Sequence, residues 1–226
     1  MTSQEITNQH NQQNIKIAVD NCIFTIKDSK LQVLLIKMKD KLSDHWALPG
    51  GLIHNQETPD DSAKRILKEQ TGVDNVYLEQ LYTFGQLDRD PFGRVTSIAY
   101  FALIPSNPIK LETTVKYTDI RWWPIDKLPK LAYDHDKITS YAKQRLAWKI
   151  SYTNVVWSLL PAKFTLTDLQ KVYEIILDRA FDKRNFRKKI MALKLIRQTT
   201  GLQSGPHRPA KLYEFISKKP KIVEIL

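Results

Sequence analysis

The 226-residue chain has a single cysteine, Cys22, and therefore cannot form an internal disulfide. It also lacks an apolar run of the roughly 20 residues that cross a membrane. Its first residues, MTSQEITNQHNQQN, show neither the basic nor the apolar region of a signal peptide. These absences argue against a secreted disulfide scaffold, a cysteine-rich zinc site and a membrane protein. We therefore expect a cytoplasmic protein.

Acidic side chains are scarce in the last third of the chain. Over the whole chain, 35 Lys and Arg against 24 Asp and Glu give a net charge of +11. Residues 1–150 hold 20 basic and 18 acidic side chains (net +2), whereas residues 151–226 hold 15 and 6 (net +9). This asymmetry favours a polyanionic partner for the C-terminal part, although a solvated basic surface would give the same counts.

Hydropathy patterning predicts an α+β protein of two domains. Residues 1–13 are polar and rich in Asn and Gln, which predicts a disordered tail. Strand patterns cover 15–26 and 31–38 and recur around 76–87, 95–104 and 120–123, and a helix is expected over 136–150. The composition changes after that helix. We expect a first domain at 14–150, a linker at 151–160 and a second domain at 161–226.

A further helix is expected directly after residue 58, and its ends are well marked. Thr58 can cap it, Pro59 suits the first helical position, and Gly72 can end it in a left-handed conformation. Six residues around this helix have the spacing of a Nudix box: Gly51, Glu57, Arg65, Glu69, Gly72 and Val73. Residues 14–150 thus resemble a Nudix domain, and the resemblance implies an α/β/α sandwich.

Two positions depart from that box. In Nudix hydrolases, glutamates on one helix face hold Mg²⁺ against a diphosphate and help to activate water. Ile66 and Gln70 stand where the box has glutamates, so we expect no catalytic residue, no metal and no cofactor. Replacement ligands could come from Asp88, Asp90 or Glu79. The remaining box residues could form an ion-pair network that only braces the loop and helix: Glu57, Arg65 and Glu69.

Candidate ligand contacts follow the box. Arg89 and Arg94 flank a Pro-Gly turn, and guanidinium groups match phosphate oxygens bidentately, so this pair could clamp a diphosphate. Alternatively, Arg89 could pair with a neighbouring aspartate, Asp88 or Asp90, on the surface. The other expected effector-binding residues come from the box helix and the start of the later helix: Arg65, Glu69, Asp134 and His135.

The second domain has the pattern of a winged helix-turn-helix. Thr165 and Asp168 open one helix with a near capping box, and Asp182 can cap a second helix over 182–193. Two strands, 195–199 and 210–216, enclose a Gly- and Pro-containing loop at 200–209 that resembles a wing. The alternative is a solvated helix pair used for dimerisation.

The second helix buries an apolar stripe and surrounds it with basic groups. Lysines can contact DNA phosphates, while Arg and Asn can read guanine and adenine edges in the major groove. The expected DNA-binding residues come from both helices and the wing: Thr165, Thr167, Lys183, Arg184, Asn185, Arg187, Lys188 and Arg208.

Over about residues 14–217, the chain resembles the Nudix-related transcriptional regulators, in which a Nudix-like sensor precedes a winged helix-turn-helix. Supporting runs include Leu159-Leu160-Pro161, Asp182 to Arg187, and Arg208-Pro209-Ala210. Members of that family similarly lose Nudix glutamates. The resemblance implies a homodimeric repressor that binds a palindromic operator in double-stranded DNA and releases it on binding ADP-ribose or a related NAD metabolite. Two alternatives remain, a regulator responding to a sugar such as arabinose and an active ADP-ribose pyrophosphatase.

Overall fold

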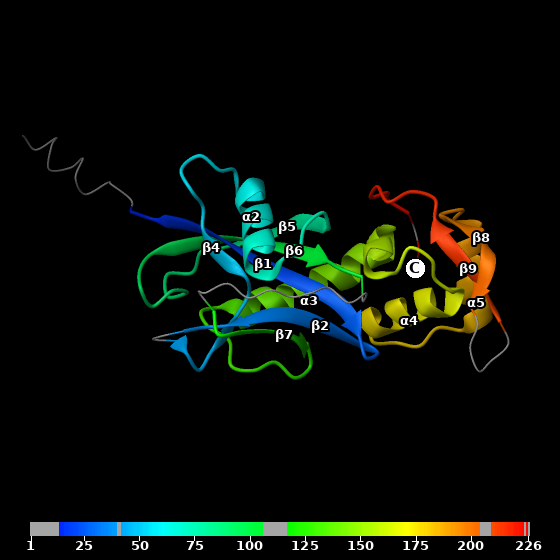
Figure 1. Cartoon of the computed structure of the whole chain (residues 1–226), viewed down its shortest axis with the longest axis horizontal. Helices are drawn as coiled ribbons and strands as arrows, with labels where there is room; N and C mark the ends of the chain where they lie inside the picture. Colours follow the sequence, from blue (N-terminus) through cyan, green and yellow to red (C-terminus); the bar gives the residue numbers. More distant parts are fainter. Residues whose placement is uncertain (1–13, 40–41, 106–116, 204–208, 224, 226) are drawn as a thin grey trace, which may run out of the picture.

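The computed structural model describes residues 14–39, 42–105, 117–203, 209–223 and 225 (Figure 1). The tail expected at 1–13 and Arg208 at the expected wing tip lie outside these residues. The N-terminal part contains β1 (Lys16–Lys27), β2 (Lys30–Lys37), β3 (Trp46–Ala47), β4 (Gly50–Leu52), α2 (Pro59–Thr71), β5 (Tyr77–Phe84), β6 (Val95–Leu103), β7 (Asp119–Pro124) and α3 (His135–Tyr152). The C-terminal part contains η2 (Val155–Leu159), α4 (Leu166–Leu177), α5 (Lys183–Ala192), β8 (Ile196–Gln203) and β9 (Ala210–Phe215).

One mixed sheet forms the centre of the N-terminal domain. Its strand order is β3-β2-β1-β6-β5, with β4 paired to β1 and β7 to β2. Alternate residues of β1 face opposite sides. Cys22 and Phe24 join the core cluster that includes Ile138 of α3, whereas Val19 packs in a cluster with Ile66 of α2. The two helices therefore cover opposite faces (Figure 1), and the expected α/β/α sandwich is confirmed.

Local signals explain two of the connections. Asp28 and Ser29 between β1 and β2 have φ values of 52° and 56°, the left-handed pair of a type I′ hairpin turn. The Thr58 side chain accepts a hydrogen bond from the Asp61 backbone N–H, and Gly72 ends α2 with φ 73°. Both helix ends match the predictions from sequence, and the turn joins the two strands expected at 15–26 and 31–38.

The C-terminal part is the expected winged helix. The strands β8 and β9 pair antiparallel, and β8 extends beyond the predicted strand to Gln203. Phe164 exchanges two backbone hydrogen bonds with Tyr213 of β9, at 3.0 and 2.8 Å, which fixes the hairpin to the start of α4. Asp182 caps α5 as predicted.

The two domains share one continuous apolar core. A single cluster contains Phe101 of β6, Ile150 of α3 and Tyr173 of α4. The segment expected as a linker, 151–160, includes the 3-10 helix η2, in which four of five residues are buried. The connection between the domains is thus packed, and the limits given to each domain stay a prediction. No helix within the described ranges is long and apolar enough to cross a membrane.

Candidate functional site

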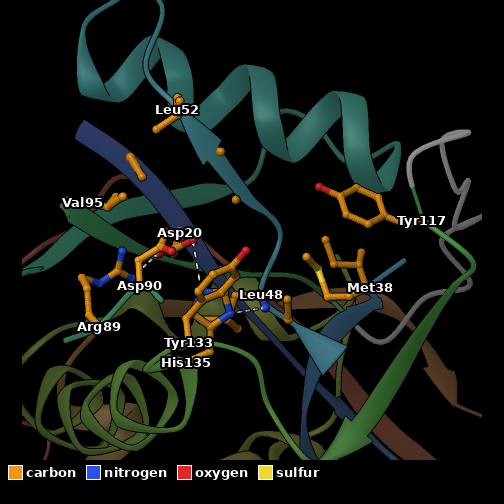
Figure 2. A pocket seen from close by; sticks show the side chains of 15 residues that line it. Asp20, Met38, Leu48, Leu52, Arg89, Asp90, Val95, Tyr117, Tyr133 and His135 are labelled. Carbon is orange, nitrogen blue, oxygen red and sulfur yellow. Dashed lines mark hydrogen bonds and ion pairs between the residues drawn. The ribbon is translucent and has the colours of Figure 1, made fainter. Parts of the chain in front are cut away.

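A cavity of about 220 Å³ lies at the N-terminal end of α3. Strand β1 contributes Ala18 and Asp20, on the same face of the strand as Cys22, because side chains alternate along it. Figure 2 shows Asp20 and Arg89 at one end of the cavity and Met38 and Tyr117 at the other. The cavity therefore has a polar end and a more apolar, aromatic end, the arrangement typical of small-molecule sites.

The polar end is organised by a buried ion-pair network. Arg89 donates from Nη2 to Asp134 Oδ1 at 2.8 Å and to Asp20 Oδ2 at 3.1 Å, and its Nε lies 3.2 Å from both Asp134 oxygens. All three side chains are less than a tenth exposed. Two negative charges therefore flank one positive charge, and two of the three guanidinium nitrogens of Arg89, Nε and Nη2, are already engaged.

His135 joins this network through a defined tautomer. Its Nδ1 accepts a hydrogen bond of 2.9 Å from the backbone N–H of Leu48. A backbone N–H can only donate, so the proton of the neutral ring sits on Nε2, which faces Asp20 Oδ1 at 3.4 Å. Tyr133 lies beside the imidazole, with ring centroids 5.2 Å apart (Figure 2).

The network keeps Asp20 ionised. Desolvation on burial raises the pKa of Asp20, but contacts with His135, the Ser97 hydroxyl and the charge of Arg89 outweigh it and hold the pKa at about 2, against an ordinary 3.8. Since this pKa is lower in the folded state, the stabilisation is fully present above about pH 4 and is lost as the pH falls toward 2.

We therefore expect the stability difference between the wild-type protein and an Asp20→Asn variant to shrink by about 2 kcal/mol as the pH falls from about 5 to about 2. As the pH falls toward 2, Asp20 takes up a proton and comes closer to the uncharged asparagine. Urea unfolding at a series of pH values measures the difference. A difference that stays constant over this range would contradict the assignment.

The Nudix-box loop passes very close to this network. A Cβ atom on Gly50 would lie 2.1 Å from Asp20 Oδ1 and 2.9 Å from the Val19 carbonyl oxygen, so only glycine fits there. The Gln70 carboxamide accepts from the Gly50 N–H at 3.1 Å and donates to the Gly50 carbonyl at 2.9 Å. A glutamate at position 70 would lack the donor. Gln70 thus fastens the loop to α2 at a position where the box has a metal ligand.

Arg65 and its partners form a brace beside that loop. Arg65 donates to both Glu57 oxygens, with the Nη2 bond at 2.9 Å, and to Glu69 at 3.2 Å. The Glu57 pKa is about 2, chiefly because of the hydrogen bond from Arg65. These contacts match the bracing network left open from sequence. Among the described residues, no group of three or more His, Cys, Asp or Glu side chains could hold a metal ion.

Two of the three replacement ligands expected from sequence, Glu79 and Asp90, have partners within the protein. Glu79 contacts Lys149 and Arg145 of α3. Asp90 accepts from the Phe92 N–H and lines the cavity.

The diphosphate clamp expected from Arg89 and Arg94 stays a prediction, and both arginines have partners within the protein. Arg89 is held by Asp20 and Asp134, and not by its neighbours Asp88 and Asp90. Arg94 donates to the carbonyls of Gly85 and Gln86, both at 2.9 Å, and so closes the loop before β6. Part of each guanidinium is therefore engaged within the protein, Nε and Nη2 in Arg89 and Nη1 in Arg94. Of the six expected effector-binding residues, Arg89 and His135 line the cavity, and Asp134 orients Arg89 from behind it.

The other two expected residues line an adjoining hollow. Arg65 and Glu69 border a space of about 600 Å³ on the α2 side of the box loop. This space shares Gly51 and Leu52 with the cavity at α3. The two spaces therefore adjoin at strand β4.

The expected DNA-binding residues divide into an exposed set and a structural set. On α5, Phe186 and Ile190 are buried, whereas Lys183, Arg184, Asn185 and Lys188 are exposed. Thr165 is buried, and its side chain is used in a capping box with Asp168. The structure thus gives Thr165 a role within α4.

Arg187 connects the two helices. Its Nη2 donates to Thr167 Oγ1 at 3.3 Å, and its Nε is buried without a hydrogen-bond partner. Thr167 itself is exposed. The Arg187 guanidinium lies beside an exposed helix start, a place that suits a phosphate arriving from outside the chain.

Sequence reasoning missed several residues of the cavity. Asp20 is the principal omission, and a charged residue inside the apolar run IAVDNCIF could have marked it. Tyr133 adopts φ 55°, an unusual conformation for a non-glycine residue, at the mouth of the site. Tyr117 and Met38 lie in segments without a recognisable motif.

Comparison with known families agrees with this two-part architecture. Residues 16–143 match the NUDIX domain family, and residues 156–215 match the NrtR DNA-binding winged helix domain. A protein of Acinetobacter baylyi described as an ADPR responsive transcriptional repressor, NtrR, is 36% identical over 205 residues, which cover 88% of this chain and 81% of the relative. An ADP-ribose pyrophosphatase of Methanocaldococcus jannaschii is 35% identical over 134 residues, covering 59% and 74%.

Solved structures of Shewanella oneidensis NrtR are also similar. NrtR complexed with a 27mer DNA superposes with a TM-score of 0.78 at 31% identity, covering 88% of this chain and 93% of that one. The NUDIX domain of the same protein, complexed with ADP ribose, superposes with a TM-score of 0.55 at 30% identity, covering 65% and 99%. The similarity to NrtR thus includes both domains in the same order.

Proposed function

The chain belongs to the NrtR family of Nudix-related transcriptional regulators, and from this premise we propose that it is a repressor whose operator affinity falls when ADP-ribose binds the Nudix domain. In this proposal two subunits bind a palindromic operator through α5 and the wing. A bacterial chromosome lies in the cytoplasm, which is where such a repressor acts.

The two hydrogen bonds between Gly50 and Gln70 are the observation that favours a sensor over an enzyme. Gln70 Oε1 accepts from the Gly50 N–H at 3.1 Å and Gln70 Nε2 donates to the Gly50 carbonyl at 2.9 Å, so that this position offers no ligand to a metal. Ile66 is fully buried, and the one glutamate left on that face, Glu69, pairs with Arg65. A diphosphate hydrolysis that depends on clustered carboxylates and Mg²⁺ is poorly supported by such a helix.

The two adjoining spaces support ADP-ribose as the effector. The Asp20 carboxylate lines the cavity and can accept more than one hydrogen bond at each oxygen, so it suits a ribose hydroxyl, and Tyr133 offers an aromatic face for stacking. Because the Arg89 network holds two carboxylates for one guanidinium, we place the hydroxyl-rich part of the ligand in the cavity at α3. The Arg65 guanidinium is likewise paired, with Glu57 and Glu69, so a diphosphate near Arg65 would have to displace the more exposed partner, Glu69. A differential affinity of ADP-ribose for the two DNA-binding states is required for release.

Fluorescence anisotropy with DNA from directly upstream of the gene, at fixed salt, tests this function. We expect saturating ADP-ribose to weaken operator binding by roughly 5- to 150-fold, the usual range of allosteric coupling. The same weakening is expected in EDTA, because the described residues contain no metal cluster. Operator binding that ADP-ribose does not change, together with a thermal shift on adding arabinose, would favour the sugar-responsive alternative.

The alternative of an active pyrophosphatase rests on the 35% identity to the Methanocaldococcus enzyme. Such an enzyme would convert ADP-ribose and water into AMP and ribose 5-phosphate. Mg²⁺-dependent formation of AMP that is abolished by Glu69→Gln would support it and contradict a sensor without enzymatic activity.

A further inference from the structure

The chain continues beyond the wing hairpin and returns to the junction of the two domains. We call residues 218–225, all described except residue 224, the C-terminal strap. Figure 1 shows this red segment leaving β9 and returning toward the end of α3. The Val223 N–H donates to the Tyr152 carbonyl at 2.9 Å and the Ile225 N–H to the Ser151 carbonyl at 3.2 Å. The strap thus bonds to the last turn of α3.

Asn154, between α3 and η2, holds the strap with three hydrogen bonds. Its Nδ2 donates to the Lys219 carbonyl at 3.1 Å, its Oδ1 accepts from the Lys221 N–H at 2.7 Å, and its own backbone N–H donates to the Lys221 carbonyl at 3.2 Å. Asn154 is only 2% exposed. An aspartate would lack the donor and an alanine both groups, so only a carboxamide satisfies this stretch of backbone.

An apolar anchor supports the same attachment. Ile225 is buried to the same degree as Asn154, and it joins the core cluster that contains Ile150 and Val155. Ile222, in contrast, is 82% exposed, although its backbone bridges to Thr153. The strap is therefore fixed by its backbone and by one side chain, and the rest of it contributes little burial.

Helix α3 joins the effector cavity to this attachment. It begins at His135, which lines the cavity, and ends at Tyr152, which bonds to the strap. Eighteen residues at 1.5 Å each make the helix about 27 Å long. Its buried face carries Ile138, Ala142, Leu146 and Ile150, all in the core cluster that the sheet, η2 and α4 share. Because such a core is close-packed, we expect a shift at His135 to move the helix as a unit. Ile216 and Ser217 join the end of β9 directly to the start of the strap.

Asn154 and the strap lie outside both family matches. The NUDIX match covers residues 16–143, and the winged-helix match covers residues 156–215. We propose that Asn154 and the C-terminal strap are positioning elements that couple the cavity to the winged helix, by tying the far end of α3 to β9. The proposal rests on the function proposed above, since it needs an effector and an operator. Asn154 contacts neither ligand in this scheme and acts through the orientation of the domains.

The first test measures coupling separately from binding. Operator affinity is measured by anisotropy with and without saturating ADP-ribose, for the wild-type protein, Asn154→Ala and the control Ile222→Ala. We expect Asn154→Ala to reduce the ratio of the two operator Kd values at least fivefold, toward one, while ADP-ribose affinity changes less than about threefold. Ile222→Ala should keep the wild-type ratio. An unchanged ratio in folded Asn154→Ala would overturn the proposal, because a merely stabilising contact would lower Tm alone.

The second test needs neither ligand. Spin labels on Lys64→Cys in α2 and Lys211→Cys in β9 report the distance between the domains, and the native Cys22 is fully buried. Labelled protein is diluted in excess unlabelled protein so that each assembly carries one labelled copy. We expect Asn154→Ala to broaden the distance distribution, and an unchanged distribution would overturn the proposal.

The two tests separate this inference from the proposed function. If ADP-ribose does not change the operator affinity of the wild-type protein, the proposed effector is wrong. The distance measurement would still decide whether the strap orients the domains. If Asn154→Ala does not fold, Asn154→Asp keeps the acceptor for the Lys221 N–H and removes only the donor to Lys219.

Discussion

Replacing Arg89 by alanine is expected to lower the free energy of unfolding by about 3–5 kcal/mol. The guanidinium is the shared partner of Asp20 and Asp134, and all three side chains are less than a tenth exposed. Removing it leaves two carboxylates buried near each other without a compensating charge. Because small domains have only about 5–15 kcal/mol of stability, a loss of this size would leave the variant close to unfolding.

Urea unfolding at neutral pH measures the loss, and Arg145→Ala is the matched control. Arg145 also pairs with a carboxylate, Glu79, but Glu79 keeps Lys149 as a partner at 2.8 Å. The control should therefore lose less than about 1 kcal/mol, as partly exposed pairs do. Adding Asp134→Asn to Arg89→Ala removes one orphaned charge and should recover part of the stability. Equal losses for Arg89→Ala and Arg145→Ala would show that burial does not dominate the energetics of this network.

The fold could be predicted from sequence because its signals are local. The ends of α2 depend on Thr58 and Gly72, and the β1–β2 turn depends on two residues between two apolar runs. The cap of α5 by Asp182 is equally local. Each signal needs only a few neighbouring residues, so that short-range chemistry determines it.

The site could not be predicted in the same way. Asp20 and Arg89 are 69 residues apart, and Arg89 and Asp134 are 45 apart. Sequence alone suggests nearby partners for an arginine, which is why Asp88 and Asp90 were considered. Only the pairing of β1 with β6 and the packing of α3 on that face bring the three charges together. The strap was missed for a similar reason, because its described residues, 218–223 and 225, carry no motif and bond to groups far away in the sequence.

The same long-range network links the effector site to the fold. Asp134 immediately precedes α3 and binds Arg89, and His135 begins the helix and faces Asp20. A ligand hydroxyl that bonds to Asp20 would compete directly with these contacts. Small movements at the cavity would then be transmitted directly to α3, with no intervening element, because the first residues of the helix are part of the site.

Removing two charges from the outer face of α5, with Arg184→Ala and Lys188→Ala together, is expected to weaken operator binding about 100-fold at physiological salt. Both side chains are exposed and lie on the side of α5 away from Phe186 and Ile190, so neither has a role in the core. If both contact phosphates, the slope of log K against log salt should fall by about two units, because each neutralised phosphate contributes about 0.9.

A double variant elsewhere, Lys64→Ala with Lys68→Ala, separates local contact from overall charge. Both lysines are exposed on α2 in the Nudix domain, and the change removes the same net charge. We expect operator affinity to fall less than about threefold and the salt slope to stay close to wild type. The reason is that at physiological salt, screening weakens the interaction between exposed charges beyond about 8 Å. If both double variants weaken binding equally, the α5 face is only part of a diffuse positive field. If only the Arg184 and Lys188 variant loses operator affinity, α5 lies against the DNA backbone, as we expect from the exposed basic face of that helix.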